Sequence, residues 1–111
     1  MNSITKLKDA LHLRMYGNPD EYFEETVWNL EVDAICEDLT AAIDFVLSEC
    51  TDEELYWLSE VFEDIADRTR SADFIKCLQK RVQRVENAEW RQSILDEILV
   101  MLDYVDESLP E

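Results

Sequence analysis

Carboxylates spaced three or four residues apart are the side chains of this sequence with the clearest capacity for chemistry. Residues 60–67 read Glu-Val-Phe-Glu-Asp-Ile-Ala-Asp, and a helix over them places Glu60, Glu63, Asp64 and Asp67 on one side. We call these four residues the acidic ladder. Like charges one turn apart cost a helix about 0.2–0.5 kcal/mol per pair, and no basic residue offsets them before Arg68. The ladder is therefore a solvated surface, a docking strip for cationic side chains, or a metal site.

The docking interpretation gains side chains from the same helix. Glu53 and Tyr56 lie on the face of the ladder, and Trp57 lies at the edge of the apolar stripe. Aromatic side chains among carboxylates are typical of the contacts that dominate protein interfaces, although such positions also suit a flanking core. We predict that Glu53, Tyr56 and Trp57 join the acidic ladder in a partner-binding surface.

A second set of carboxylates is predicted on the preceding helix. Asp33, Glu37 and Asp44 fall away from the apolar face of a helix over residues 33–50, so they form a second acidic strip. The basic residues lie mainly at the N-terminus and between Arg68 and Arg91. The acidic first half of the chain is therefore the better candidate for an interface.

The metal interpretation needs a second carboxylate motif. All-α nucleotide pyrophosphohydrolases bind Mg²⁺ with ExxE and ExxD pairs on two facing helices, and the ladder matches one such pair. Asp96-Glu97 and the acids at 21, 24 and 25 lack the spacing of the second, and no Lys/Arg cluster accompanies them. The only histidine, His12, excludes a His-based triad. We predict no enzyme activity, no metal and no cofactor, with a Mg²⁺-dependent pyrophosphohydrolase as the alternative.

The elements that position these side chains are all predicted to be helices. The 111 residues include one glycine and two prolines, too few for the tight turns of a sheet, and 47% are apolar, enough for a core. Short connections between helices favour antiparallel neighbours. We expect a single all-α domain over residues 1–111, with five or six antiparallel helices in a bundle or a short repeat-like stack and a frayed tail at 106–111.

Capping residues indicate where the helices begin and end. Ser3 starts the first helix, and Gly17 ends it in a left-handed conformation. Asn18-Pro19 starts the next, whose apolar rows shift enough to predict a break near Glu31–Asp33. The remaining starts are a capping box and two single caps, at Thr51-x-x-Glu54, Ser71 and Asn87.

The capping box opens a helix over residues 52–69, and Asn87 opens one that reaches about Tyr104. Leu95, Leu99 and Val100 widen the apolar stripe of that last helix nearly all the way round. Because a helix that is apolar on most sides packs between neighbours, we predict that it is the central helix.

Charge limits the choice of partner. Twenty-seven acidic residues against ten basic ones give a net charge of −17, which disfavours direct binding to nucleic acid or to an anionic membrane. Such a field serves solubility, or it steers the protein toward a basic protein partner. No stretch suits a signal peptide or a membrane span, and three cysteines without CxxC spacing suit a reducing compartment. We expect a cytoplasmic protein.

The segment from Leu58 to Ile75, LSEVFEDIADRTRSADFI, resembles small all-helical immunity proteins of bacterial contact-dependent growth inhibition and polymorphic toxin systems. The shared motif is structural, with core positions and a cap at Ser71, so it transfers no catalytic residue. The resemblance implies a cognate basic toxin domain as partner, commonly a nuclease, with an RNase favoured. The carboxylates of helices 52–69 and 33–50 would then occlude its active site by pairing with toxin Lys and Arg in place of phosphates.

Overall fold

The computed structural model describes residues 2–17 and 24–105, and every regular element within these ranges is helical. In chain order the elements are α1 (Ser3–Tyr16), α2 (Glu24–Glu37), α3 (Leu39–Ser48), α4 (Asp52–Leu58), the 3-10 turn η2 (Ser59–Val61), α5 (Phe62–Thr69), α6 (Ala72–Val82) and α7 (Ala88–Leu102). Because α4, η2 and α5 follow one another without a loop, they form one rod, which we call the central rod. The predicted all-α fold is confirmed.

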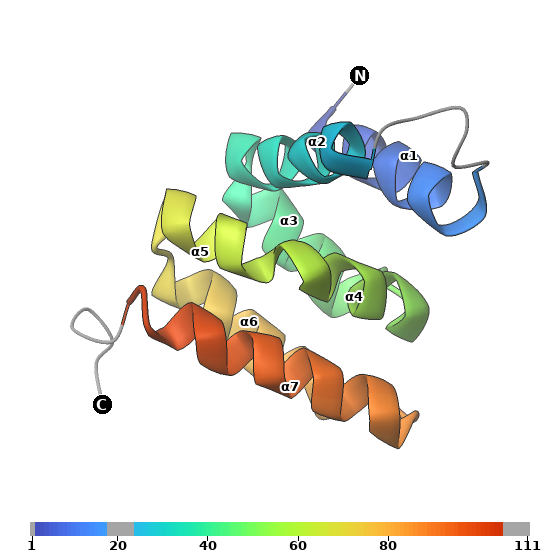
Figure 1. Cartoon of the computed structure of the whole chain (residues 1–111). Helices are drawn as coiled ribbons and strands as arrows, with labels where there is room; N and C mark the ends of the chain where they lie inside the picture. Colours follow the sequence, from blue (N-terminus) through green and yellow to red (C-terminus); the bar gives the residue numbers. More distant parts are fainter. Residues whose placement is uncertain (1, 18–23, 106–111) are drawn as a thin grey trace.

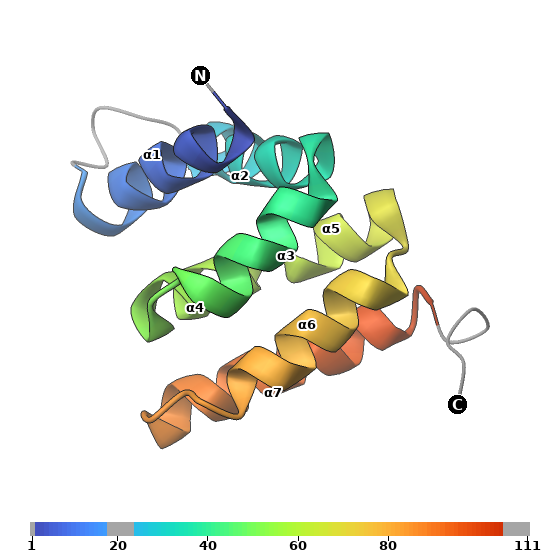
Figure 2. The same cartoon turned by 180° about the vertical axis from the view of Figure 1, so that it is seen from behind.

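The central rod crosses the middle of the molecule (Figure 1). The hairpin of α1 and α2 packs on one side of it and α7 packs on the other. Helices α3 and α6 pack against each other behind the rod, and both lie in front in Figure 2. Leu58, Phe62 and Ile65 of the rod have no exposed surface, so the rod supplies the centre of the core.

The prediction that the last helix is central is wrong. α7 lies at an edge of the fold, where Leu99 is 62% exposed and both Leu95 and Val100 are only partly buried. The central rod takes that place because its inward face, with Leu58, Val61 and Phe62, is completely buried, and α2 and α7 pack on either side of it.

Burial at this turn also changes the backbone. The predicted single helix over residues 52–69 is two α-helices joined by the 3-10 turn Ser59–Val61. Ser59 is buried there, and its hydroxyl donates a 2.6 Å hydrogen bond to the carbonyl of Tyr56. A hydroxyl that bonds back to the preceding turn competes with the helical hydrogen bonds, which accounts for the local departure from α geometry.

Three of the predicted helix starts are confirmed. The hydroxyl of Thr51 accepts from the backbone N–H of Glu54 at 3.1 Å, and the Glu54 carboxylate accepts from the N–H of Thr51 at 2.9 Å. Ser71 caps α6 and Asn87 caps α7. The first helix differs, because the side chain of Asn2 caps it and Ser3 is its first, buried residue.

The left-handed residue lies elsewhere than predicted. Gly17 is extended, with φ −77° and ψ 161°. A Cβ there would overlap the carbonyl of Leu13, so a close backbone approach requires the glycine. The left-handed conformation belongs to Arg70, with φ 47° and ψ 39°, which ends α5.

The predicted break near Glu31–Asp33 is wrong, because α2 continues from Glu24 to Glu37. The chain turns at Asp38, whose carboxylate accepts from the N–H of Ala41 at 3.1 Å and caps α3. The predicted helix start at Asn18-Pro19 and the tail at 106–111 lie outside the described residues. None of the helices in the described ranges is long and apolar enough to cross a membrane.

The capping box gives a direct test of how the central rod begins. We expect Thr51→Ala to lower the free energy of unfolding by about 1 kcal/mol, because the N–H of Glu54 loses its acceptor. Thr40→Ala, an exposed substitution inside α3, should change it by less than about 0.5 kcal/mol. Urea denaturation of both variants measures the difference, and equal midpoints would contradict the assigned role of the cap.

Candidate functional site

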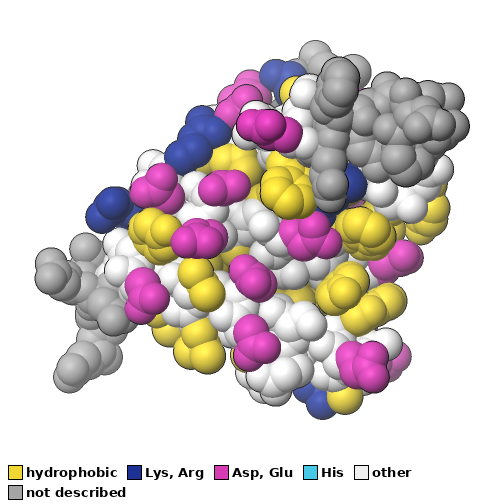
Figure 3. All heavy atoms as spheres, in the orientation of Figure 1, with side chains coloured by type: hydrophobic (Ala, Val, Ile, Leu, Met, Phe, Trp, Pro, Cys, Tyr) yellow, Lys and Arg dark blue, Asp and Glu magenta, His cyan; other side chains and the backbone are white. Residues whose placement is uncertain are grey.

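The acidic ladder is exposed along one side of the central rod. Glu60 belongs to η2, and Glu63, Asp64 and Asp67 belong to α5, which lies between α2 and α7. Figure 3 shows Asp and Glu side chains distributed across this face, with Lys and Arg at its margins. The inward side chains of Val61, Phe62 and Ile65 fix this orientation, because they hold the opposite side of the rod in the core.

Most of the ladder is not neutralised by the protein's own cations. Within residues 2–17 and 24–105, no Lys or Arg nitrogen lies within 4.0 Å of the carboxylates of Glu60, Glu63 or Asp64. Asp67 has one distant partner, Arg70 at 3.8 Å. Glu63 accepts a 2.7 Å hydrogen bond from the hydroxyl of Tyr104, which leaves its charge in place.

Neighbouring helices bring to the ladder carboxylates that the sequence analysis considered only as parts of a metal site. Glu97 of α7 lies near enough to the ladder for its pKa to be raised, by burial first and then by the charges of Glu63, Asp96 and Glu60. This proximity arises from the packing of α7 against the rod.

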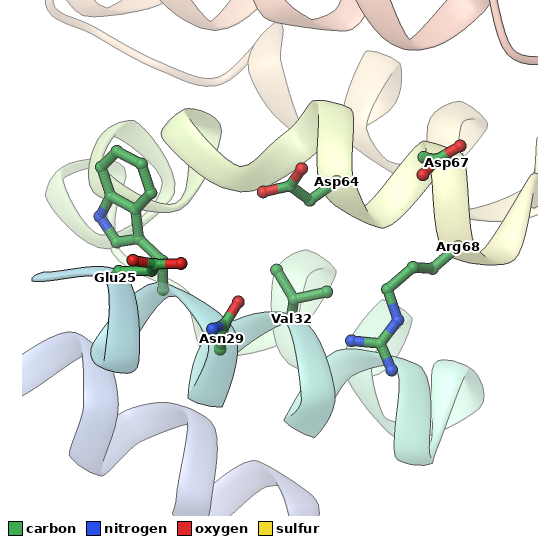
Figure 4. Close-up of a pocket in the computed structure, with 7 residues that line it drawn as sticks. Glu25, Asn29, Val32, Asp64, Asp67 and Arg68 are labelled. Atoms are coloured by element: carbon green, nitrogen blue, oxygen red, sulfur yellow. The ribbon is translucent and has the colours of Figure 1, made fainter.

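On the other side of α5, a groove of about 600 Å³ separates the rod from α2 (Figure 4). Glu25 on α2 and Asp64 and Asp67 on α5 line it, with Arg68 at one end. Trp28, Asn29 and Val32 complete the lining. The ladder is therefore flanked by acids from both neighbouring helices.

The predicted second strip does not form as one surface. Asp33 and Glu37 lie on α2, whereas Asp44 lies on α3, because the helix predicted over 33–50 is two helices. Asp33 pairs with Arg68 at 2.6 Å and Glu37 pairs with Lys6 at 3.1 Å. Asp44 is exposed on a helix that packs behind the rod. Of the two predicted sets, only the ladder keeps most of its charge free of cations in the described chain.

The three residues that extend the ladder have different environments. Tyr56 is half-buried, stacks on Trp90 with ring centroids 5.3 Å apart, and lines a pocket of about 210 Å³ with Glu60 and Glu97. Glu53 is half-buried and accepts a long hydrogen bond, 3.4 Å, from the hydroxyl of Tyr16. Trp57 packs against a buried arginine instead, so of the two predicted aromatic side chains Tyr56 is the one beside the ladder.

That arginine, Arg14, and its partner Glu31 were missed by the sequence interpretation. Both are buried, with Nη1 of Arg14 3.3 Å from Oε1 of Glu31. The guanidinium lies 5.8 Å from the Trp28 ring and 5.5 Å from the Trp57 ring, and it donates to the carbonyl of Trp57. The sequence did indicate a buried carboxylate in need of a cationic partner, because Glu31 shares a helix face with Val27 and Ala34.

Burial raises the pKa of Glu31 to about 7, against the opposing effect of Arg14 and with a smaller contribution from Glu60. Glu60 of the ladder lies close enough to contribute to this shift, so the buried carboxyl of Glu31 is affected by one charge of the acidic surface.

The described residues contain no group of three or more His, Cys, Asp or Glu side chains arranged to hold a metal ion. The approach of Glu97 to Glu60 and Glu63 does place acids of two helices together, as the pyrophosphohydrolase alternative requires. Neither observation supplies the missing ExxD motif, so the docking interpretation is the one we develop.

The buried pair predicts a specific pH dependence of stability. Because the pKa of Glu31 is higher in the folded chain than its ordinary value of 4.5, the folded state binds more protons than the unfolded state between pH 4.5 and about 7. Its contribution to the free energy of unfolding is complete below pH 4.5 and falls as the pH rises to about 7, by up to about 3 kcal/mol.

Glu31→Gln should remove this part of the slope, whereas Glu37→Gln, an exposed change on the same helix, should keep the wild-type slope. Denaturation at a series of pH values measures both variants. A slope in Glu31→Gln equal to that of the wild type would show that Glu31 does not titrate in this range.

Comparisons of the chain with protein-family models, with curated proteins and with solved structures find no match in any of the three. The resemblance to immunity proteins therefore rests on the segment from Leu58 to Ile75 together with the helical layout and the acidity. What the structure establishes is a small all-α globular protein with a carboxylate-rich face on its central rod.

Proposed function

We propose that this protein is an immunity protein that binds and neutralises a basic toxin domain, a nuclease with an RNase favoured, through the acidic ladder. The observation that carries the proposal is that Glu60, Glu63 and Asp64 are exposed on one rigid rod with no cation within 4.0 Å in the described chain. Surface acids that serve only solubility have no need of a shared face, whereas a cationic partner requires one.

The geometry suits direct pairing with Lys and Arg side chains. From Glu60 to Asp67 the ladder extends ~10 Å at 1.5 Å per residue, and its backbone is held by the core. A rigid array of acceptors loses little conformational entropy on binding, and charge-assisted bonds to guanidinium are the stronger class of hydrogen bond. Nuclease active sites hold phosphates with cations, so a rod of carboxylates can occupy the same place.

Electrostatics would act before contact. A net charge of −17 attracts a basic domain at long range and raises the association rate by one to three decades, roughly, at low ionic strength. On the face drawn in Figure 3, Asp and Glu side chains are spread across the surface, and most of the Lys and Arg side chains lie toward its edges.

Tyr56 would give the interface its apolar contact. Its ring is half-buried on Trp90 beside Glu60 and Glu97, so it presents a preordered aromatic edge among acids. Rigid aromatic side chains at the centre of a polar surface are the usual dominant contacts of protein interfaces.

Charge reversal of the ladder tests the proposal. The quadruple variant Glu60→Lys, Glu63→Lys, Asp64→Lys and Asp67→Lys should bind the toxin domain more weakly by several kcal/mol, roughly, and associate more slowly. The proposal places the toxin in the reading frame immediately upstream, so the partner to assay is the C-terminal domain of the protein encoded there. Its RNA cleavage, with and without this protein, is the readout.

The matched control reverses four exposed acids outside both predicted acidic sets: Glu49, Asp73, Glu86 and Glu89. It changes the net charge equally, so it should slow association through the long-range field while retaining inhibition at saturation. Equal loss of inhibition in both variants would assign the effect to net charge alone. Full inhibition by the ladder variant would overturn the proposal.

A further inference from the structure

A second surface of the molecule is a groove between α1 and α2, on the far side of α2 from the ladder. It has a volume of about 480 Å³, and its apolar lining consists of Ala10 and Leu13 from α1 with Leu30 and Ala34 from α2. Leu30 is 50% exposed there, one of three large apolar side chains in the described ranges with so much surface in water. Nothing in the fold of the described chain uses that exposed surface, because the core side of α2 is formed by Val27, Val32 and Ile35.

We propose that this groove binds a basic amphipathic helix of a partner protein, which inserts apolar side chains one turn apart. The groove extends along α1 from Lys6 to Leu13, ~10 Å at 1.5 Å per residue, or two turns of a partner helix. Two apolar side chains three or four residues apart fit that length, as in other helix-in-groove contacts. The inference goes beyond the proposed function, since it needs neither the ladder nor a nuclease.

The charges at the rim select the sign of the partner. Asp33 and Glu37 lie one turn apart on the α2 side, and Asp9 lies on the α1 side with Lys6. The ion pairs of Asp33 with Arg68 and of Glu37 with Lys6 have side chains 46–62% exposed. Exposed pairs of this kind contribute little, so Lys and Arg of an arriving helix can exchange into them at small cost.

The same charge disfavours a second copy of this chain as the occupant. Two molecules of net charge −17 repel each other, and an interface as small as this groove supplies too little apolar area to offset that repulsion. An acidic helix would be repelled by this field, and a neutral helix would gain from the apolar floor alone. A basic helix alone gains from both the apolar floor and the rim.

The test uses a synthetic helical peptide of leucine and lysine, with leucines every three or four residues, titrated into the ¹⁵N-labelled full chain. We expect saturable shifts of the amides that border the α1–α2 groove. Leu30→Lys should weaken this binding about tenfold, which is ~1.4 kcal/mol. Leu99→Lys is the matched control, because Leu99 is 62% exposed, lies on α7, and gives the same change in charge.

A peptide of the same composition in scrambled order separates the groove from general attraction to acids. The proposal holds when the scrambled peptide leaves the groove amides unshifted and only Leu30→Lys weakens the ordered one. Equal weakening by both leucine variants, or shifts confined to the ladder, would overturn it. Dimers of the free chain would also overturn the proposal, if sedimentation velocity at high salt detects them and Leu30→Lys dissociates them. If the ladder variant still inhibits the toxin fully, the proposed function fails, but the result with the peptide is unchanged. The two proposals are therefore tested separately.

Discussion

The burial of the central rod is the constraint on which the rest of the structure depends. Leu55, Leu58, Val61, Phe62 and Ile65 have no exposed surface, so the rod has little freedom to rotate about its axis. The carboxylates of Glu60, Glu63 and Asp64 then point to the side left in water. The acidic ladder is the outward half of the same periodicity that fills the core. A change that loosened the core would therefore also disperse the carboxylates.

This constraint explains how the protein tolerates its charge. Like charges at adjacent turns oppose helix formation by a few tenths of a kcal/mol per pair, roughly, whereas each fully buried large apolar side chain contributes about 1.5–3 kcal/mol. The apolar side of the rod outweighs the repulsion on its acidic side. Repulsion is also reduced at the margins, where Arg68, Arg70 and Lys6 pair with acids of their own or neighbouring helices.

The sequence allowed the helices to be predicted because their signals are local. Thr51 with Glu54, Ser71 and Asn87 cap helices through bonds within four residues, and those caps are present. The errors have a tertiary origin. The shift of the apolar rows suggested a break near Glu31, but the helix continues, and Arg14, seventeen positions earlier, pairs with Glu31 in the core. The exposed Leu99 suggested a central helix, although no neighbour covers it.

The candidate surface was predictable to the same extent. The ladder follows from spacing within one helix, so its exposure could be anticipated residue by residue. Glu25 and Glu97 were candidates for a facing metal motif that their spacing did not complete, and the packing of α2 and α7 on the rod is what brings them to the ladder. Asp33 and Glu37 were expected to act as free acids, yet Arg68 and Lys6 lie beside them because separate helices meet there.

The pKa shifts connect this surface to binding. Burial and the charges of Glu63, Asp96 and Glu60 raise the pKa of Glu97, and its bond to Glu63 raises that of Tyr104, with the charges of Glu63, Asp67 and Asp64 adding to the effect. The parts of these two shifts that come from neighbouring carboxylates record a negative potential around the ladder. A cationic side chain placed among these groups would remove part of that repulsion, so binding gains the energy that folding spent in bringing the acids together. The same repulsion that weakens the free protein then favours the complex, which makes a carboxylate face on a rigid rod better suited to a basic partner than to solubility alone.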